Sequence, residues 1–103
     1  MIHTEQQIRE KAKKIISDLN NDSKYFKPDC IDSIVFSENK QLLKSGEEIE
    51  GVWLIYLKVL FKNIDILTLS DETGEPIFIR RFTYQVQEIK KDNAGNYHVL
   101  KNE

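Results

Sequence analysis

The sequence predicts an α+β domain in which an N-terminal helix packs on a curved antiparallel sheet of four to five strands. Three observations lead to this prediction. One amphipathic segment lies near the start of the chain, a dense apolar run follows at residues 51–61, and two turn-like segments divide the remaining second half. A helix followed by strands that are joined by turns is typical of an antiparallel meander.

Size and composition predict one soluble domain spanning residues 1–103. A chain of 103 residues has room for one hydrophobic core, and 40% hydrophobic with 31% charged residues is ordinary for a globular protein. The 17 acidic and 15 basic residues leave a net charge of -2. This weak negative balance provides no long-range attraction to nucleic acids or anionic membranes, so we expect neither partner.

The expected location is the cytoplasm. Cys30 is the one cysteine, which excludes an internal disulfide and suits a reducing compartment. The first residues lack the basic segment and apolar run of a signal peptide. The longest apolar run, Val52–Leu57, is far shorter than the roughly 18 residues that a membrane span needs.

The first element is a helix that begins after Thr4. Thr4 is a good N-cap, and Gln7 completes a capping-box pattern. The polar residues 20–23 end the helix. One apolar stripe at helical spacing then comprises Ile8, Ala12, Ile15, Ile16 and Leu19. A one-sided stripe on a single helix requires a sheet to pack against.

The next segments are a first strand at residues 31–37, a polar loop or hairpin at 38–46, and an ambiguous segment at 46–62. Ser45 and Glu48 form a second capping-box pattern, which favours a helix for the ambiguous segment. Gly51 and the many β-branched and aromatic residues favour a strand, with Trp53–Phe61 apolar on both faces. The N-terminal helix covers one of these faces, and the other needs loops, curvature or a partner.

The remaining strands are expected at residues 64–70, 77–89 and 97–100. The Asp71–Glu75 and Asp92–Asn96 segments have the composition of turns. Within 77–89 the alternation of apolar residues breaks at Arg80–Arg81. Two explanations are open: a bulge resets the register and bends the strand, or Arg80 points inward.

Two groups of residues are candidates for binding. Glu47, Glu48 and Glu50 form an acidic patch that suits a basic partner surface, or else a solvated loop. Arg80 and Arg81 suit an anion or carboxylate in the concave face of a curved sheet. In that second arrangement Trp53 and Tyr84 line the pocket, although aromatic residues on strands more often belong to the core.

Catalytic and metal-binding patterns are not evident in the sequence. Cys30 lies between Asp29 and Asp32, whose charges disfavour a thiolate nucleophile. His3 and His98 have no acid or cysteine at ligand spacing, so we expect no metal site and no cofactor. These patterns predict that the protein is not an enzyme.

The order of elements resembles that of several small bacterial families. A helix, a strand with Trp53 and an Asp-x-Thr-Gly-Glu hairpin at Asp71–Glu75 are similar to immunity proteins and PepSY-like domains, over about half of the chain. The curved sheet is similar to cystatin-like and nuclear-transport-factor-like cones. Resemblance to immunity proteins implies inhibition of a toxin by direct binding, and resemblance to the cones implies a pocket.

Three functional hypotheses follow from these patterns. The first is a non-enzymatic cytoplasmic module that binds a protein, possibly an immunity-type inhibitor that masks its partner directly through the acidic patch. The alternative is a small-ligand-binding domain with an anion site at Arg80 and Arg81. The third is a homodimer formed through the exposed face of the Trp53–Phe61 strand.

Overall fold

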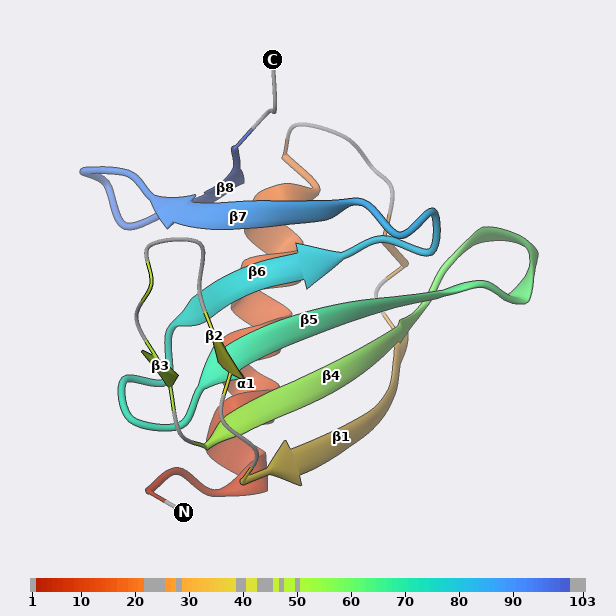
Figure 1. Cartoon of the computed structure of the whole chain (residues 1–103). Coiled ribbons are helices and arrows are strands. Elements are labelled where there is room, and N and C mark those ends of the chain that lie inside the picture. Colours follow the sequence, from red (N-terminus) through yellow and green to blue (C-terminus); the bar gives the residue numbers. More distant parts are fainter. Residues whose placement is uncertain are drawn as a thin grey trace.

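The computed structural model describes residues 2–21, 26–27, 29–38, 41–42, 46, 48–49 and 51–100. Helix α1 packs on a six-stranded antiparallel sheet with strand order β1-β4-β5-β6-β7-β8 (Figure 1). The α+β class is confirmed, with more strands than the expected four to five. The elements are α1 (Glu5–Leu19), β1 (Ile31–Ser37), β2 (Gln41–Leu42), β3 (Glu48–Ile49), β4 (Val52–Lys58), β5 (Ile64–Ser70), β6 (Pro76–Arg80), β7 (Val86–Lys91) and β8 (Tyr97–Val99).

Local sequence determines α1 as predicted. The Gln7 N–H donates to the Thr4 side-chain oxygen at 3.1 Å, and the Thr4 N–H donates to the Gln7 side-chain oxygen at 2.8 Å, which completes the capping box. All five residues of the predicted apolar stripe are buried. Burying each large aliphatic side chain stabilises the fold by about 1.5–3 kcal/mol, so this stripe holds α1 on the sheet.

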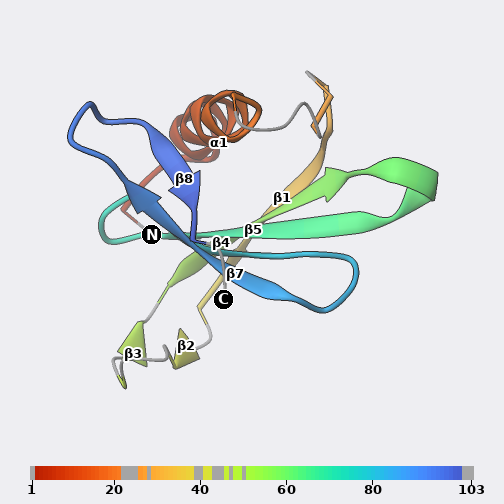
Figure 2. The ribbon, with the colours of Figure 1, turned by 90° about the horizontal axis from the view of Figure 1, so that it is seen from above.

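The two faces of the sheet are covered differently (Figures 1 and 2). Helix α1 lies across one face, and the β2–β3 hairpin stands on the side away from the helix (Figure 2). On the face away from the helix, Leu54, Tyr56 and Ile66 are half-buried. Val52, Thr68 and Ser70, on the same face near the start of β4, are buried. The core lies under the helix and includes Trp53, Ile55, Leu57, Leu67, Leu69, Ile79, Ile89 and Tyr97.

The ambiguous segment forms strands, but β4 is shorter than expected. It ends at Lys58, and the chain turns through a short 3-10 helix at Leu60–Lys62 before β5 begins. Phe61 and Lys62 have positive φ angles of 59° and 62°, which are incompatible with a strand. The prediction that the strand extends to Phe61 is therefore wrong, and the Phe61 side chain is 93% exposed.

The expected strand at 77–89 is two strands joined by a turn, and this provides the additional strand. Strand β6 ends at Arg80, residues 82–84 reverse the chain, and β7 pairs back with β6. Chain reversal, rather than a bulge at Arg80–Arg81, breaks the alternation. The irregularity in β6 lies at Ile77 instead, because Leu69 pairs with Pro76 and Thr68 pairs with Phe78.

Candidate functional site

Two turns at one end of the sheet carry exposed apolar side chains. The β4–β5 and β6–β7 turns lie at the same end (Figure 1, right). We call their four large apolar residues the aromatic end: Leu60, Phe61, Phe82 and Tyr84 are 54%, 93%, 40% and 87% exposed. Exposed apolar residues that gather at one place mark interaction sites more often than singly scattered ones. Of these four residues, only Tyr84 was among the predicted binding residues.

The β4–β5 turn is held by hydrogen bonds across its base. The Val59 N–H donates to the Asn63 carbonyl at 2.9 Å, and the Asn63 side-chain amide donates to the Leu60 carbonyl at 2.8 Å. A non-glycine residue at positive φ costs about 1–2 kcal/mol. Phe61 and Lys62 both have this conformation, and the almost fully exposed Phe61 ring recovers little of the cost through packing.

The β6–β7 turn is held in a similar way. The Arg81 N–H donates to the Gln85 carbonyl at 2.8 Å, and the Tyr84 N–H donates to the Arg81 carbonyl at 2.9 Å. Tyr84 has a φ of 70°, so it too occupies the left-handed region while its ring lies in solvent. Both turns thus combine positive φ with an exposed aromatic ring.

A buried carboxylate anchors the β6–β7 turn to the start of β5. Asp65 is fully buried, and its carboxylate accepts a hydrogen bond from the Phe82 N–H at 2.8 Å. The Arg81 Nε atom lies 3.3 Å from the other carboxylate oxygen, and the guanidinium lies 5.6 Å from the ring centre of Phe26. Burial raises the pKa of Asp65, opposed by the Phe82 N–H and the Arg81 charge. Arg81 therefore has a structural task.

Basic residues border the aromatic end. Lys62 lies in the β4–β5 turn and Arg80 is the last residue of β6, and both are exposed. In the described parts of the chain, no acidic group lies within ion-pair distance of Lys62 or Arg80. Lys58 pairs with Asp32, the two charged groups being 3.3 Å apart. Lys62 and Arg80 therefore place two exposed positive charges at the rim of the aromatic end.

The four predicted ligand-binding residues lie at different places. Trp53 is buried under α1 and donates its indole N–H to Asp71 at 2.8 Å. Arg80 lies exposed at the end of β6, Arg81 is engaged with Asp65, and Tyr84 lies in solvent at the turn. None of the four lines the groove beside the C-terminal half of α1. That groove is lined by Lys13, Ile16, Ser17, Asn20, Asn21, Phe26 and Lys27.

The predicted acidic patch is only partly visible. Glu48 lies in β3 with an exposed side chain, whereas Glu47 and Glu50 lie outside the described residues. Strand β3 directly precedes the start of β4, which is at the opposite end of β4 from the aromatic end. Glu48 and the aromatic end therefore lie on separate surfaces.

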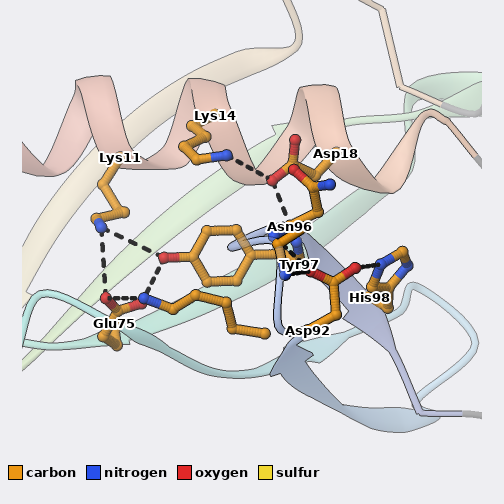
Figure 3. Close-up of polar contacts among 10 residues, drawn as sticks. Lys11, Lys14, Asp18, Glu75, Asp92, Asn96, Tyr97 and His98 are labelled. Atoms are coloured by element: carbon orange, nitrogen blue, oxygen red, sulfur yellow. Dashed lines mark hydrogen bonds and ion pairs between the residues drawn. The ribbon is translucent and has the colours of Figure 1, made fainter.

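A polar cluster around Tyr97 joins β8 to α1 and to the β5–β6 turn (Figure 3). The Tyr97 hydroxyl donates to Glu75, and the Tyr97 N–H donates to Asp18 at 3.1 Å. The Lys91 ammonium lies 3.1 Å from Glu75. Three lysine ammonium groups lie 5.6–5.8 Å from the centre of the Tyr97 ring, those of Lys11, Lys14 and Lys91.

Proton transfer at neutral pH is not favoured in this cluster. Burial raises the pKa of Tyr97, and the hydrogen bond and charge of Glu75 raise it further. Burial also acts to raise the pKa of Glu75, but the Tyr97 hydroxyl and the ammonium groups of Lys91 and Lys11 outweigh it and hold that pKa low. The phenol stays neutral and the carboxylate stays charged, so the cluster has a structural role: it links β8 to α1 and to the β5–β6 turn.

A second polar cluster lies at the same end of the sheet, around Asp71, a buried residue of the β5–β6 turn. Its carboxylate accepts hydrogen bonds from the N–H groups of Ile2 at 2.6 Å and His3 at 3.0 Å, and from the indole of Trp53. Burial acts to raise the pKa of Asp71, but the donors in His3, Trp53 and Ile2 outweigh it and hold the pKa below its usual value. We call this end of the sheet the clasped end.

Within the described residues, no three histidine, cysteine, aspartate or glutamate side chains are grouped to hold a metal ion. The part of the chain that the structure describes has no helix of the length and apolarity that crossing a bilayer demands. No protein-family model matches the chain, and neither a curated protein nor a solved structure matches it.

Proposed function

We propose that the protein is a non-enzymatic cytoplasmic module that binds a partner protein through the aromatic end and masks the surface that it covers. One observation carries the proposal: Phe61 and Tyr84 both have a positive φ angle, and both expose their aromatic rings to solvent. Backbone strain without compensating packing lowers the stability of the isolated chain. A partner that buries both rings provides a reason for this arrangement.

Rigidity of the two turns supports this proposal. The hydrogen bonds across each turn and the Asp65 anchor order the backbone before any partner arrives. A pre-ordered surface loses less conformational entropy on binding, which increases affinity. Aromatic side chains are the typical anchors of interfaces because each buries a large area with few rotatable bonds.

The rim of the aromatic end favours a partner with an acidic border around an apolar pocket. Lys62 and Arg80 would meet carboxylates at the edge of the contact, where charge chiefly sets the association rate and the orientation. Asp29, which precedes β1, and Asp32, which lies within β1, are at this same end. An anionic membrane would repel these carboxylates, whereas a protein surface can place cations next to them.

The immunity-type role stays within this proposal, because inhibition by direct masking needs only a stable contact over a functional surface of the partner. The acidic patch of Glu47, Glu48 and Glu50 remains a second predicted contact, for a basic partner surface. If charge reversal of these three residues leaves the affinity for the partner unchanged, this second contact is refuted.

The test is affinity capture from the native host with a matched control. The double variant Phe61→Ser, Tyr84→Ser removes both exposed rings, and Ile2→Ser, Leu100→Ser removes two other exposed apolar side chains, which are 69% and 41% exposed. We expect the wild type and the control to capture the same protein and the Phe61/Tyr84 variant to lose it. Equal capture by all three proteins would refute the proposal.

A further inference from the structure

We infer that two copies of the chain pair antiparallel through the free edge of β1. Strand β1 is the first strand of the sheet, with β4 on one side, and the described residues place no strand on its other side (Figure 1). Its seven residues make it much longer than β8, the three-residue strand at the opposite edge. A long free edge presents a row of main-chain donors and acceptors to a partner strand.

The hydrogen bonds of β4 show which residues of β1 face outward. In an antiparallel ladder, alternate residues of a strand direct their N–H and C=O groups to the same neighbour. The Asp71 N–H donates to the Gly51 carbonyl at 3.0 Å, so the odd-numbered residues of β4 bond to β5. The even-numbered residues of β4 therefore bond to β1.

Those even-numbered residues fix the phase of β1. They pair with Ser33, Val35 and Ser37, whose main-chain groups consequently point toward β4. The main-chain groups of Ile34 and Phe36 point away from the sheet. These two residues provide two N–H and two C=O groups for another strand.

The sequence of this edge is complementary to itself. Residues 33–37 read Ser-Ile-Val-Phe-Ser, with a serine at each end, a bulky apolar residue inside each serine and Val35 at the centre. Antiparallel pairing about Val35 places Ser33 opposite Ser37 of the second copy and Ile34 opposite Phe36. Val35, which is 46% exposed, meets its own counterpart.

The devices that usually protect an edge are absent from this stretch. Free edges commonly carry charged residues, prolines or bulges, and residues 33–37 contain neither a charged residue nor a proline. The register shift in β1 lies before Ser33, where Asp32 pairs with Lys58. This bulge ends the pairing before Asp32 reaches Glu38 of the second copy, so no like charges are brought together.

The hydrogen-bonding phases of the two copies also agree. With Ile34 and Phe36 facing outward, each Ile34 forms a hydrogen-bonded pair with Phe36 of the other copy. Val35 and its counterpart then form the close pair, whose Cα atoms are about 4.5 Å apart. The two-fold axis passes through this pair at right angles to the sheet.

This dimer uses a surface separate from the aromatic end and adds to the proposed function. The two six-stranded sheets join into one continuous sheet with both helices on the same face. Because β1 begins at the aromatic end and the two β1 strands run in opposite directions, the two aromatic ends point away from each other. The dimer is therefore able to hold two partners at once, which increases the strength of binding to a multivalent target.

The first experiment measures the oligomeric state by sedimentation equilibrium over a range of protein concentrations. We expect the wild type to form a dimer and Val35→Lys to be monomeric, because the two-fold axis brings the two new charges together. Asn93→Lys, in the exposed β7–β8 turn next to the opposite edge, adds the same charge and should leave the dimer intact. A monomeric wild type, or a Val35→Lys variant that remains dimeric, would overturn the inference.

The second experiment tests the register and does not depend on the folding of Val35→Lys. Under oxidised glutathione, Val35→Cys should form a disulfide-linked dimer, because the pair lies at the distance that a disulfide requires. Ser33→Cys and Ser37→Cys should each crosslink poorly alone and well when mixed. The wild type, whose Cys30 is buried, is the control. Absence of a Val35→Cys crosslink, or equal crosslinking by Ser33→Cys alone, would overturn the pairing.

Discussion

The two ends of the sheet differ in where their side chains find contacts. At the clasped end, polar groups are satisfied within the chain: Asp71 accepts three N–H groups, and Glu75 accepts the Tyr97 hydroxyl. At the aromatic end, main-chain hydrogen bonds close both turns, but Phe61 and Tyr84 direct their rings into solvent. The clasped end serves stability, whereas the aromatic end keeps large side chains available for a partner.

Glycine makes the same contrast visible in the backbone. The β5–β6 turn uses Gly74 at a φ of 73°, where a Cβ would lie 2.8 Å from Nε2 of His3. The turns of the aromatic end have the same kind of φ at Phe61, Lys62 and Tyr84. The clasped end therefore uses the residue that suits its backbone, and the aromatic end retains side chains at a cost in stability.

The largest expected effect is the removal of the Asp71 carboxylate. Asp71→Ala leaves the donors of Ile2, His3 and Trp53 without their acceptor, and the Trp53 indole is buried. We expect a loss of about 2–4 kcal/mol in the free energy of unfolding, measured by urea denaturation. Asp71→Asn keeps one acceptor oxygen and should lose less. An unchanged midpoint for Asp71→Ala would show that the clasp contributes nothing.

A smaller effect is expected from glycine substitutions that separate backbone strain from close contact. Gly74→Ala combines an unfavourable φ with a clash against His3 and should destabilise by about 1–3 kcal/mol. Gly95→Ala has a similar φ of 87° but no atom within 4 Å of the new Cβ, so it should cost less. Thermal or urea unfolding of both variants gives the comparison. Equal losses in the free energy of unfolding would show that the contact with His3 contributes nothing to the cost.

Acid should weaken the clasped end specifically. Because the folded-state pKa of Asp71 is below its unfolded value, its contribution is complete above the unfolded pKa of about 4. That contribution is lost as the pH falls through the folded-state pKa. The stability difference between wild type and Asp71→Asn should therefore shrink in acid, in urea titrations from neutral pH to about pH 3. Exposed Glu72→Gln is the control, and a difference independent of pH would contradict the assignment.

Local patterns predicted the parts of the fold that depend on near neighbours. The capping box of Thr4 and Gln7 and the apolar stripe define α1 completely, because every determinant lies within one helix. The β-branched and aromatic density after Gly51 correctly favoured strand for β4. The buried face of this strand lies under α1, as one amphipathic helix requires.

Long-range contacts decide the parts that sequence reasoning missed. Residues 81–85 contain no glycine, proline or asparagine, so they resemble a strand; the Asp65 carboxylate, sixteen or more residues earlier, fixes them as a turn. Arg81 was expected at an anion site for the same reason, since its partner Asp65 is distant in sequence. Tyr84 was a candidate for binding, but its neighbours at the aromatic end depend on two turns that the sequence does not signal.

The most direct test of this account is the free energy of unfolding of Phe61→Gly, Tyr84→Gly. Glycine accepts both positive φ angles, and the lost rings are almost fully exposed. We predict that the double variant is more stable than the wild type by about 1 kcal/mol, after the entropy that glycine adds to the unfolded chain. A variant less stable than the wild type would contradict the account, because the two rings would then stabilise the fold rather than await a partner.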